Sequence, residues 1–487
     1  MDSLAEQLAR RIRAEFSSRP WIVATGIVQG AVRSAAAMSA AGAERVLAIG
    51  VRDGVGPLDE TVETLRLGRS LRGSMMGRGS MMEGIRHDEA VLDALDPDTC
   101  ARIDRFDPSK EARVVVDVPS VAGRVAGRAT FGARPPAWRD LEDKLAILEV
   151  WDAAGVETAP HEIVALSDQD GARAAHARLA TELGTVWALD NHDGWHGGAG
   201  GTHWARTTQD AERIAAAASR TNRLARVMPF LDGVPCSIHG LVLPGGVAVF
   251  RPMEMLIFRD PETGELSYGK AASFWDPRSQ DRAAMRRAAA ATGAELRRRL
   301  DYRGVFTLDG IVAADGFVPT EVNPRFGGAL PTSLATTPPL NLHHLHLLAV
   351  ERLLDDLDAA DLESLVLERL DAERIGVGMM LVDRAPESER SAVVHRGDDG
   401  SLRFVEEAPE RSGTDAPVAA QVRWGAGVSG GLVFVHLAST TPRGPSAAPL
   451  VLEVLRLADR AWQVGLPRLV VAPDVRPGHD VEGASPR

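Results

Sequence analysis

The sequence predicts an α/β fold (α+β overall) in three successive regions. Three observations carry this prediction. Apolar runs near the N-terminus alternate with an alanine-rich helical stretch, alternating strand-like segments dominate the middle, and short strands followed by one helix fill the C-terminal part. The chain has 487 residues, of which 45% are hydrophobic and 25% charged, as is ordinary for a globular protein of about three domains.

The composition excludes several classes of protein. A net charge of −12 argues against a nucleic-acid-binding surface, which needs a basic face. No apolar run approaches the ~20 residues that span a bilayer, and the first residues mix both charge signs, unlike a signal peptide. Cys100 and Cys236 are too few for a disulfide framework. We therefore expect a cytoplasmic protein that binds neither nucleic acid nor a membrane.

Residues 1–131 are predicted to form an N-terminal Rossmann-like domain. Residues 21–25 and 44–50 are apolar runs on either side of the alanine-rich helical stretch, and a third run ends at Pro119. Continuous apolar runs of this length are typical of parallel strands that are buried on both faces. Residues 72–84 are rich in glycine and methionine, so we expect a flexible connector there.

Two prolines mark a linker, after which residues 132–372 are predicted to form a second domain. Its first helix has an acidic first turn and ends at Gly155. A glycine-rich loop over 191–201 joins two strands, and a hairpin over 304–328 turns at Asp315 and Gly316. The other expected elements are strands within 161–166 and 226–250 and helices over 168–183 and 281–300.

The pattern changes near residue 374. Short strand-like segments and a closing helix over 449–464 predict a small β-rich C-terminal domain over 373–475. Residues 476–487 are polar and rich in proline and glycine, which predicts a flexible tail.

The hairpin carries the most informative side chains. Glu321 and Asn323 are two residues apart on its second strand, so both project from one face. The turn lies midway between Asp309 and Glu321 and folds Asp309 back beside Glu321. Two carboxylates and an amide oxygen then converge, and Mg²⁺ prefers such hard oxygen ligands. We call Asp309, Glu321 and Asn323 the oxygen triad; Arg325 follows, placed to meet an anion beside the metal.

Lysine is rare in this chain. Only three of the 55 basic residues are lysines, namely Lys110, Lys144 and Lys270. Lysine is a compact charge on a thin, flexible stem, whereas arginine is a broad planar fork. Each lysine is therefore a candidate for a role that arginine fills poorly.

The hairpin reads EVNPR from Glu321 to Arg325, with Asp309 twelve residues upstream, and this motif resembles the ATP-grasp superfamily. The resemblance extends back in order to DKL at 143–145. It implies an ATP-grasp fold of two α+β lobes over 132–372, with a glycine-rich lid at about 185–225 over the triphosphate.

The resemblance also implies which residues bind the nucleotide. DKL is similar to a helix start whose lysine contacts the ATP phosphates, and SYGK is similar to a strand that brings a second lysine to them. RVMPFLDG is similar to the hinge whose backbone reads the adenine edge. The implied cofactor-binding residues are Lys144, Lys270, Met228, Phe230, Leu231, Asp232, Gly197, Gly198 and Gly200.

The chain departs from the family pattern at two places. ATP-grasp lids carry a lysine just before the glycine loop, where Leu189 or Asp190 stands here. The nucleotide contact from that side is either weakened or supplied by another residue such as Arg206. Asp232 would substitute for the acid that holds the ribose hydroxyls.

The activity that the resemblance implies is that of a carboxylate–amine ligase. A carboxylate attacks the γ-phosphate of ATP, and an amine then displaces phosphate from the acylphosphate. ATP with Mg²⁺ (or Mn²⁺) would be the cofactors, and a small carboxylic acid and an amine the substrates. Arg325 and Lys270 would be catalytic, and Arg251, Glu254 and Arg325 would contact substrate. The sequence does not decide whether the chain forms a homodimer.

Other interpretations of the sequence remain. The alternatives to a ligase are an ATP-grasp carboxylase, a kinase-like enzyme, or an ATP-binding protein with impaired catalysis. Zinc binding is disfavoured, because a glycine-rich loop holds ligands badly and the second histidine group lies in a helix that packs. The histidines concerned are His192, His196 and His203 around the loop, and His343, His344 and His346 in the helix. Cys236 is expected to be an inert core residue.

Overall fold

The computed structural model describes residues 3–67, 81–116, 123–192, 200–334, 339–406, 417–427 and 430–476. The N-terminal part contains a four-stranded parallel sheet with the order β3-β2-β1-β4. This confirms the parallel α/β prediction. The elements are α1 (Leu4–Phe16), β1 (Trp21–Ile27), α2 (Val28–Ala40), β2 (Val46–Arg52), β3 (Glu63–Arg66), α3 (Met81–Asp93), α4 (Pro97–Phe106), β4 (Arg113–Val116), β5 (Arg124–Val125) and β6 (Arg128–Ala129).

The parallel sheet is buried because its central strand is apolar on both faces. All residues of β1 from Trp21 to Gly26 are buried, as parallel strands covered on both sides require. The connector expected over 72–84 falls largely outside the described residues, and α3 begins within it at Met81. The run expected to end at Pro119 is described only as far as Val116.

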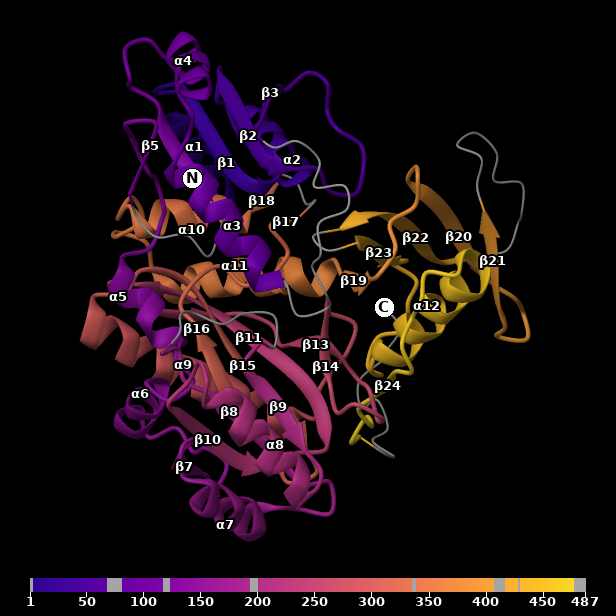
Figure 1. Ribbon diagram of the computed structural model, residues 1–487. Helices are drawn as coiled ribbons and strands as arrows, with labels where there is room; N and C mark the ends of the chain where they lie inside the picture. The colour runs from indigo at the N-terminus through magenta and orange to yellow at the C-terminus, as the bar shows by residue number, and fades with distance from the viewer. Residues whose placement is uncertain are drawn as a thin grey trace.

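A second sheet forms the first lobe of the middle region (Figure 1). Its antiparallel order is β7-β10-β8-β9, and α7 and α8 pack on it. The strands expected on either side of the glycine-rich loop are confirmed as β8 and β9. The elements are α5 (Pro136–Arg139), η1 (Asp140–Glu142), α6 (Ile147–Ala154), β7 (Glu162–Ala165), α7 (Gln169–Leu179), β8 (Thr185–Leu189), β9 (Thr202–Ala205), α8 (Thr208–Ala218) and β10 (Leu224–Pro229).

The helix α6 starts later than the sequence pattern predicted. Residues 140–142 form a short 3-10 helix and 143–146 a turn, so Lys144 precedes the helix. The Asp143 side chain accepts hydrogen bonds from the Leu145 and Ala146 amides, and these bonds stabilise the turn before the helix. Gly155 ends the helix in the left-handed conformation, as predicted.

A twelve-stranded sheet forms the centre of the molecule. Its main path runs β16-β15-β11-β13-β14-β19-β23-β22-β20-β21 and so passes without a break into the C-terminal part. The elements between residues 233 and 372 are β11 (Gly233–Leu243), β12 (Gly246–Val249), β13 (Met253–Arg259), β14 (Leu266–Ala272), α9 (Ser279–Leu300), β15 (Gly304–Ala313), β16 (Gly316–Asn323), β17 (Ser333–Leu334), β18 (Leu340–Asn341), α10 (Leu342–Val350) and α11 (Ala359–Ala372). Strands β17 and β18 form a separate two-stranded sheet.

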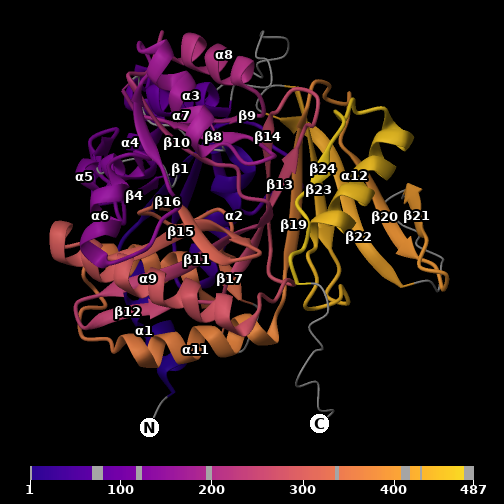
Figure 2. The same cartoon turned by 90° about the horizontal axis from the view of Figure 1, so that it is seen from below.

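The C-terminal part is rich in strands and closed by one helix, as expected, but its strands extend the central sheet. The link is the antiparallel pairing of β14 with β19. Its elements are β19 (Gly376–Val382), β20 (Arg390–Arg396), β21 (Leu402–Glu406), β22 (Val418–Gly427), β23 (Gly430–Leu437), α12 (Ala448–Trp462) and β24 (Val470–Val471). Helix α12 lies along these strands (Figure 2) and packs on residues of β13 and β14 as well.

The largest core joins the N-terminal sheet to the middle region. Leu8, Ile12 and Phe16 of α1 pack with α2 and with the leucines of α10 and α11. Figure 1 shows α10 and α11 beneath the N-terminal sheet. Among the described helices, none is both long and apolar enough to cross a membrane.

Candidate active site

The hairpin of β15 and β16 brings the oxygen triad together. The two turn residues are 314 and 315, so the predicted turn at Asp315 and Gly316 lies one residue too late. A register shift after Asp309 compensates for this, and Asp309 still pairs with Glu321 while Thr307 pairs with Asn323. The extra residue on β16 is a bulge, and bulges re-aim the side chains beside them.

Hydrogen bonds connect the triad to its neighbours. The Asn323 amide donates to Asp309 Oδ2 at 2.9 Å, and the Ser237 hydroxyl donates to Asp309 Oδ1. Arg325 donates to Asn323 Oδ1 at 2.7 Å. The three side chains therefore share one small region at the open end of the hairpin.

The triad has the electrostatics of a cation site. Burial, and next the charge of Glu321, raise the pKa of Asp309 to about 7. Two close carboxylates in a buried place disfavour ionisation, and a divalent cation would relieve that cost. The described residues contain no cluster of three or more His, Cys, Asp or Glu suited to a metal. The Asn323 oxygen is thus needed to complete a ligand set, and carboxylate and amide oxygens fit Mg²⁺.

Arg325 lies in a buried network that reaches η1. Its Nε donates to Glu142 Oε1 at 2.8 Å, and Arg134 pairs with the same carboxylate. Burial alone would lower the pKa of Arg325, but Glu142 and Glu321 raise it overall. The guanidinium is therefore held in position as a permanent cation beside the triad.

Lys144 lies between the glycine-rich loop and the triad. Its side chain is 5% exposed, and Nζ is 3.5 Å from Glu321 Oε2 and 3.4 Å from the Gly200 carbonyl oxygen, to which it donates. The preceding Asp143 accepts a hydrogen bond from the Asn191 amide at 2.7 Å. These contacts join the start of α6 to both ends of the loop and place one compact cation beside Glu321.

The residues predicted for the lid are only partly described. Gly197 and Gly198 lie outside the described residues, and so does His196. Gly200 is described and contacts Lys144. The lysine that the resemblance leads us to expect before the loop is missing, and Asp190, which follows β8, accepts hydrogen bonds from the amides of Arg223 and Leu224.

The predicted hinge connects the two lobes. Met228 is the next-to-last residue of β10, and residues 230–232 connect β10 to β11. The Phe230 amide donates to the Gly184 carbonyl at 3.0 Å, so that N–H is engaged within the protein. Asp232, the expected ribose acid, forms a 2.7 Å ion pair with Arg259. Leu231 is half-buried, and its contact with adenine stays a prediction.

Lys270 lies apart from Lys144. Its Nζ is 6.0 Å from the centroid of the Phe434 ring on β23, and burial and Arg33 lower its pKa. No described contact links it to the triad, and its predicted place on the ATP phosphates stays a prediction. Tyr268, two residues earlier, is the neighbour of the triad: after burial, the charge of Asp309 is the main cause that raises its pKa.

The two predicted substrate residues Arg251, just before β13, and Glu254, within β13, have contacts within the fold. Arg251 is buried and pairs with Asp276 and Asp371. The Glu254 carboxylate, 1% exposed, accepts hydrogen bonds from the Ala447 and Ala448 amides at the start of α12. These contacts hold structure together, and contact with a substrate stays a prediction for both.

Arg226 is a residue that the sequence analysis missed. It lies on β10 opposite Ala188, is fully buried, and donates to the Thr320 carbonyl at 2.6 Å. Burial lowers its pKa to about 10, and Glu321 and Asp143 act in the opposite direction, so both acids are close. An arginine inside the apolar strand LARVMP was the signal that could have identified it.

Arg206 does not fill the place of the missing lysine. Its guanidinium donates to the Pro261 and Glu262 carbonyls and lies over the Trp204 ring. The prediction that His346 lies in a helix that packs is confirmed. His346 accepts a hydrogen bond from the Val305 amide at 3.0 Å, and burial lowers its pKa to about 3. Burial likewise raises the pKa of the Cys236 thiol, in keeping with an inert core residue.

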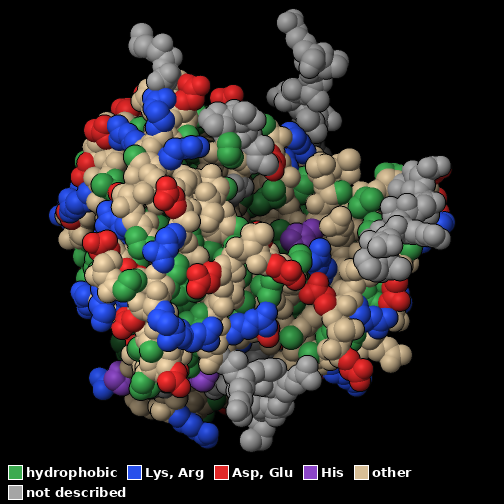
Figure 3. Space-filling model, turned by 90° about the horizontal axis from the view of Figure 1, so that it is seen from above, with side chains coloured by type: hydrophobic (Ala, Val, Ile, Leu, Met, Phe, Trp, Pro, Cys, Tyr) green, Lys and Arg blue, Asp and Glu red, His purple; other side chains and the backbone are tan. Residues whose placement is uncertain are grey.

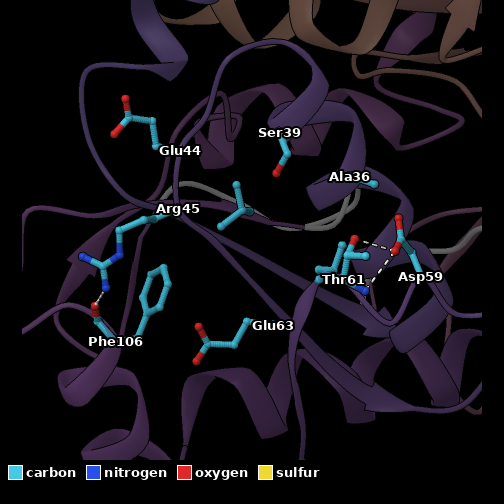
Figure 4. Close-up of a pocket in the computed structure, with 10 residues that line it drawn as sticks. Ala36, Ser39, Glu44, Arg45, Asp59, Thr61, Glu63 and Phe106 are labelled. Atoms are coloured by element: carbon cyan, nitrogen blue, oxygen red, sulfur yellow. Dashed lines mark hydrogen bonds between the residues drawn. The ribbon is translucent and has the colours of Figure 1, made fainter.

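A separate pocket lies in the N-terminal part of the chain. It has a volume of about 400 Å³ and lies between α2 and the residues around β3 (Figure 4). Glu44, Asp59 and Glu63 line it with Arg45, whose guanidinium donates to the Phe106 carbonyl. None of the triad residues lines this pocket.

The structure is similar to solved structures of proteins whose sequences differ greatly from this one. A biotin carboxylase–β,γ-ATP complex from Campylobacter jejuni matches with a TM-score of 0.50 and 11% identity, over 90% of each chain. An L-amino acid ligase from Bacillus licheniformis matches with a TM-score of 0.48 and 14% identity, over 91% of this chain and 98% of that one. No protein-family model and no curated protein matches the sequence.

Proposed function

We propose a function from the premise that this chain has an ATP-grasp fold: it is an ATP-dependent carboxylate–amine ligase. In this proposal a carboxylate is phosphorylated by ATP, and an amine displaces phosphate to leave an amide-type bond, ADP and phosphate. The observation that carries it is Lys144, whose Nζ lies within 3.5 Å of Glu321 and 3.4 Å of the Gly200 carbonyl. A lysine between a glycine-rich loop and an oxygen triad suits a triphosphate.

Each part of the site supports one task of phosphoryl transfer, which is mainly positioning and charge neutralisation. Asp309, Glu321 and Asn323 would hold Mg²⁺, which when bound neutralises phosphate charge. Lys144 would bind phosphate oxygens from the loop side. Arg325, fixed by Glu142 at 2.8 Å, would orient the acid's carboxylate. A cytoplasmic location belongs to the same proposal, since ATP and reduced thiols are both expected there.

The proposal is tested by trapping the activated acid. The protein is incubated with ATP, Mg²⁺, hydroxylamine and a panel of amino acids and small organic acids. We expect hydroxamate and ADP in equal amounts with at least one acid. Absence of both products across the panel would contradict the proposal. A bicarbonate requirement would instead identify a carboxylase, and a stable phosphorylated product without an amine a kinase-like enzyme.

Variants of the hairpin separate catalysis from binding. Asp309→Asn removes a triad carboxylate, and we expect turnover to fall at least a hundredfold because the cation site loses charge. Asp315→Asn is the matched control, because Asp315 is an exposed aspartate at the turn of the same hairpin. Tight ATP binding without turnover in the unaltered protein, unchanged by Asp309→Asn, would identify a nucleotide-binding protein without catalysis.

A further inference from the structure

Three basic side chains from distant parts of the chain meet between the N-terminal and C-terminal parts. Arg33 is on α2, Lys270 on β14 and His436 on β23. The Lys270 ammonium lies over the Phe434 ring, and that ring stacks with His436 at 6.2 Å between centroids. Burial, and after it the charges of Arg423, Lys270 and Arg33, lower the pKa of His436. We call Arg33, Lys270 and His436 the cationic hollow.

Arg33 and Lys270 are cations without an acidic partner among the described residues, whereas the pKa of His436 is lowered and its neighbour Arg423 pairs with Glu389. Within the described part of the chain, none of the three side chains forms an ion pair, and every charge that shifts their pKa values is positive. Burial is the first cause of each lowered pKa, yet Arg33 and His436 are exposed to solvent. Figure 3 shows a hollow between the two sides of the molecule, with histidine, basic and acidic side chains at its surface.

The backbone holds Lys270 in an unusual conformation. Its φ is 72°, in the left-handed region that residues other than glycine seldom adopt. The register of β13 and β14 shifts at this point, because Met255 pairs with Ala271 whereas Ile257 pairs with Tyr268. The extra residue on β14 is a bulge that re-aims the lysine. Such strain persists where the surrounding structure maintains it, commonly at ligand sites.

The hollow is distinct from the oxygen triad but close to it along β14. Tyr268 lies near Asp309 and Arg325, and Lys270 is two residues further along the same strand. No described contact connects Arg33, Lys270 or His436 to the triad. A molecule that reacts at the triad can therefore present a second group to the hollow.

We propose that Arg33, Lys270 and His436 bind a second anionic group of the acid substrate, one that does not react. The substrate is then a carboxylic acid with an additional carboxylate or phosphate. This identity rests on the proposed function, whereas anion binding in the hollow does not. The rival source of an anion is the terminal phosphate of ATP, and the two sources are distinguished by experiment.

The direct test uses the unaltered protein. Crystals are soaked in sodium selenate, and the selenium is located by anomalous scattering. We expect selenate within hydrogen-bonding reach of Arg33 and Lys270. Crystals with no selenate in the hollow at concentrations that fill other sites would overturn the proposal.

Binding in solution is measured with succinate as the probe, at constant ionic strength. We expect Lys270→Met and Arg33→Gln each to raise the Kd for succinate at least tenfold, and Arg33→Lys to restore most of the affinity. Lys110→Met is the matched control, because Lys110 is also a lysine with positive φ (58°) but lies far from the hollow in an exposed ion pair with Asp104. Equal affinities in all variants would overturn the proposal.

A second binding measurement, with an ATP analogue, distinguishes a site for the substrate from a site for the nucleotide. We expect the Kd for a non-hydrolysable ATP analogue to stay within twofold in Arg33→Gln. A tenfold loss of ATP affinity with unchanged succinate binding would assign the hollow to the nucleotide and overturn the proposal. Succinate binding without any hydroxamate formation would leave the hollow in place while removing the proposed ligase activity.

Discussion

Lys144 gives the first prediction at the scale of single residues. Lys144→Met removes the cation between Gly200 and Glu321, and one charge-assisted contact to phosphate contributes roughly 1.5–3 kcal/mol. We expect kcat/KM for ATP to fall about tenfold or more, measured by ADP release under saturating acid. Lys110→Met, which changes an exposed lysine, should leave the value unaltered. Equal kinetics in both variants would contradict the phosphate role.

Arg226 gives a second prediction at this scale. No lysine precedes the glycine-rich loop on β8, and on the adjacent strand β10 the buried guanidinium of Arg226 lies beside Glu321 and Asp143. Arg226→Met should raise the Kd for ATP about tenfold, as measured by calorimetry, and Arg226→Lys should recover part of it. Arg206→Met is the control, since Arg206 is held by backbone carbonyls elsewhere. Loss of affinity in Arg206→Met alone would refute the assignment.

The residues of the site differ in how far the sequence could predict them. The triad was predictable because its members lie on one hairpin and the period of a strand decides which side chains share a face. Arg226 and the cationic hollow were not, because they depend on pairings between strands far apart in the chain. No local pattern specifies which strand lies beside β8 or which helix faces Lys270.

At the scale of elements, the prediction for the hairpin placed the turn wrongly but the paired residues correctly. The turn was predicted one residue late, and the bulge on β16 restores the pairing of Asp309 with Glu321. A pattern of alternating residues cannot show a bulge, because the inserted residue is defined only by its partner strand. Just after the hairpin, the backbone at Gly327 lies so close to Thr307 and His239 that a side chain there would collide with both.

The start of α12 gives a prediction about pH. Burial raises the pKa of Glu254 from its ordinary 4.5 to about 7 in the folded state. The folded protein therefore binds this proton more tightly, and its stabilising contribution is complete below about pH 4.5 and lost as the pH rises through 7. We expect the free energy of unfolding to fall over this range by roughly 3 kcal/mol more than in Glu254→Gln.

The measurement is urea denaturation of both proteins at a series of pH values. The informative quantity is the difference between the two free energies of unfolding, because other titrating groups contribute equally to both. Glu254→Gln keeps an acceptor for the Ala447 and Ala448 amides, so the cap of α12 is retained. A difference that does not change between pH 4 and 8 would contradict the assigned pKa shift.

At the scale of the whole molecule, the continuous sheet predicts that the C-terminal part is required for folding. A chain that ends at residue 372 leaves the outer edge of β14 unpaired and uncovers Leu256, Phe258 and Phe274, which now pack with α12. Large buried side chains contribute roughly 2–5 kcal/mol each, against a total stability of about 5–15 kcal/mol. We expect the shortened chain to aggregate or to bind the dye ANS strongly.

The control is a chain that ends at residue 476 and retains every C-terminal residue that the structure describes. It should melt within a few degrees of the complete chain by calorimetry. A stable, cooperative fold of residues 1–372 would contradict the prediction. It would also show that the strands after β14 form an independent unit.

Sequence patterns predicted only part of the architecture of this molecule. The parallel N-terminal sheet, the hairpin and the β-rich end were predicted from periodicity, which is a local property. The domain boundaries at 131, 372 and 475 stay predictions. The union of the C-terminal strands with the central sheet was missed, because edge pairing such as β14 with β19 is decided by packing and not by residues next to each other in the chain.

The scarcity of lysine has a practical consequence. The three ammonium groups have very different surroundings: Lys110 has a 56% exposed side chain, Lys144 is 5% exposed, and Lys270 is half-buried over an aromatic ring. Reductive methylation with ¹³C-formaldehyde would therefore attach at most three labels besides the N-terminal amine. Their separate NMR signals would report occupancy of the nucleotide end and the hollow in one spectrum, with an internal reference on the surface.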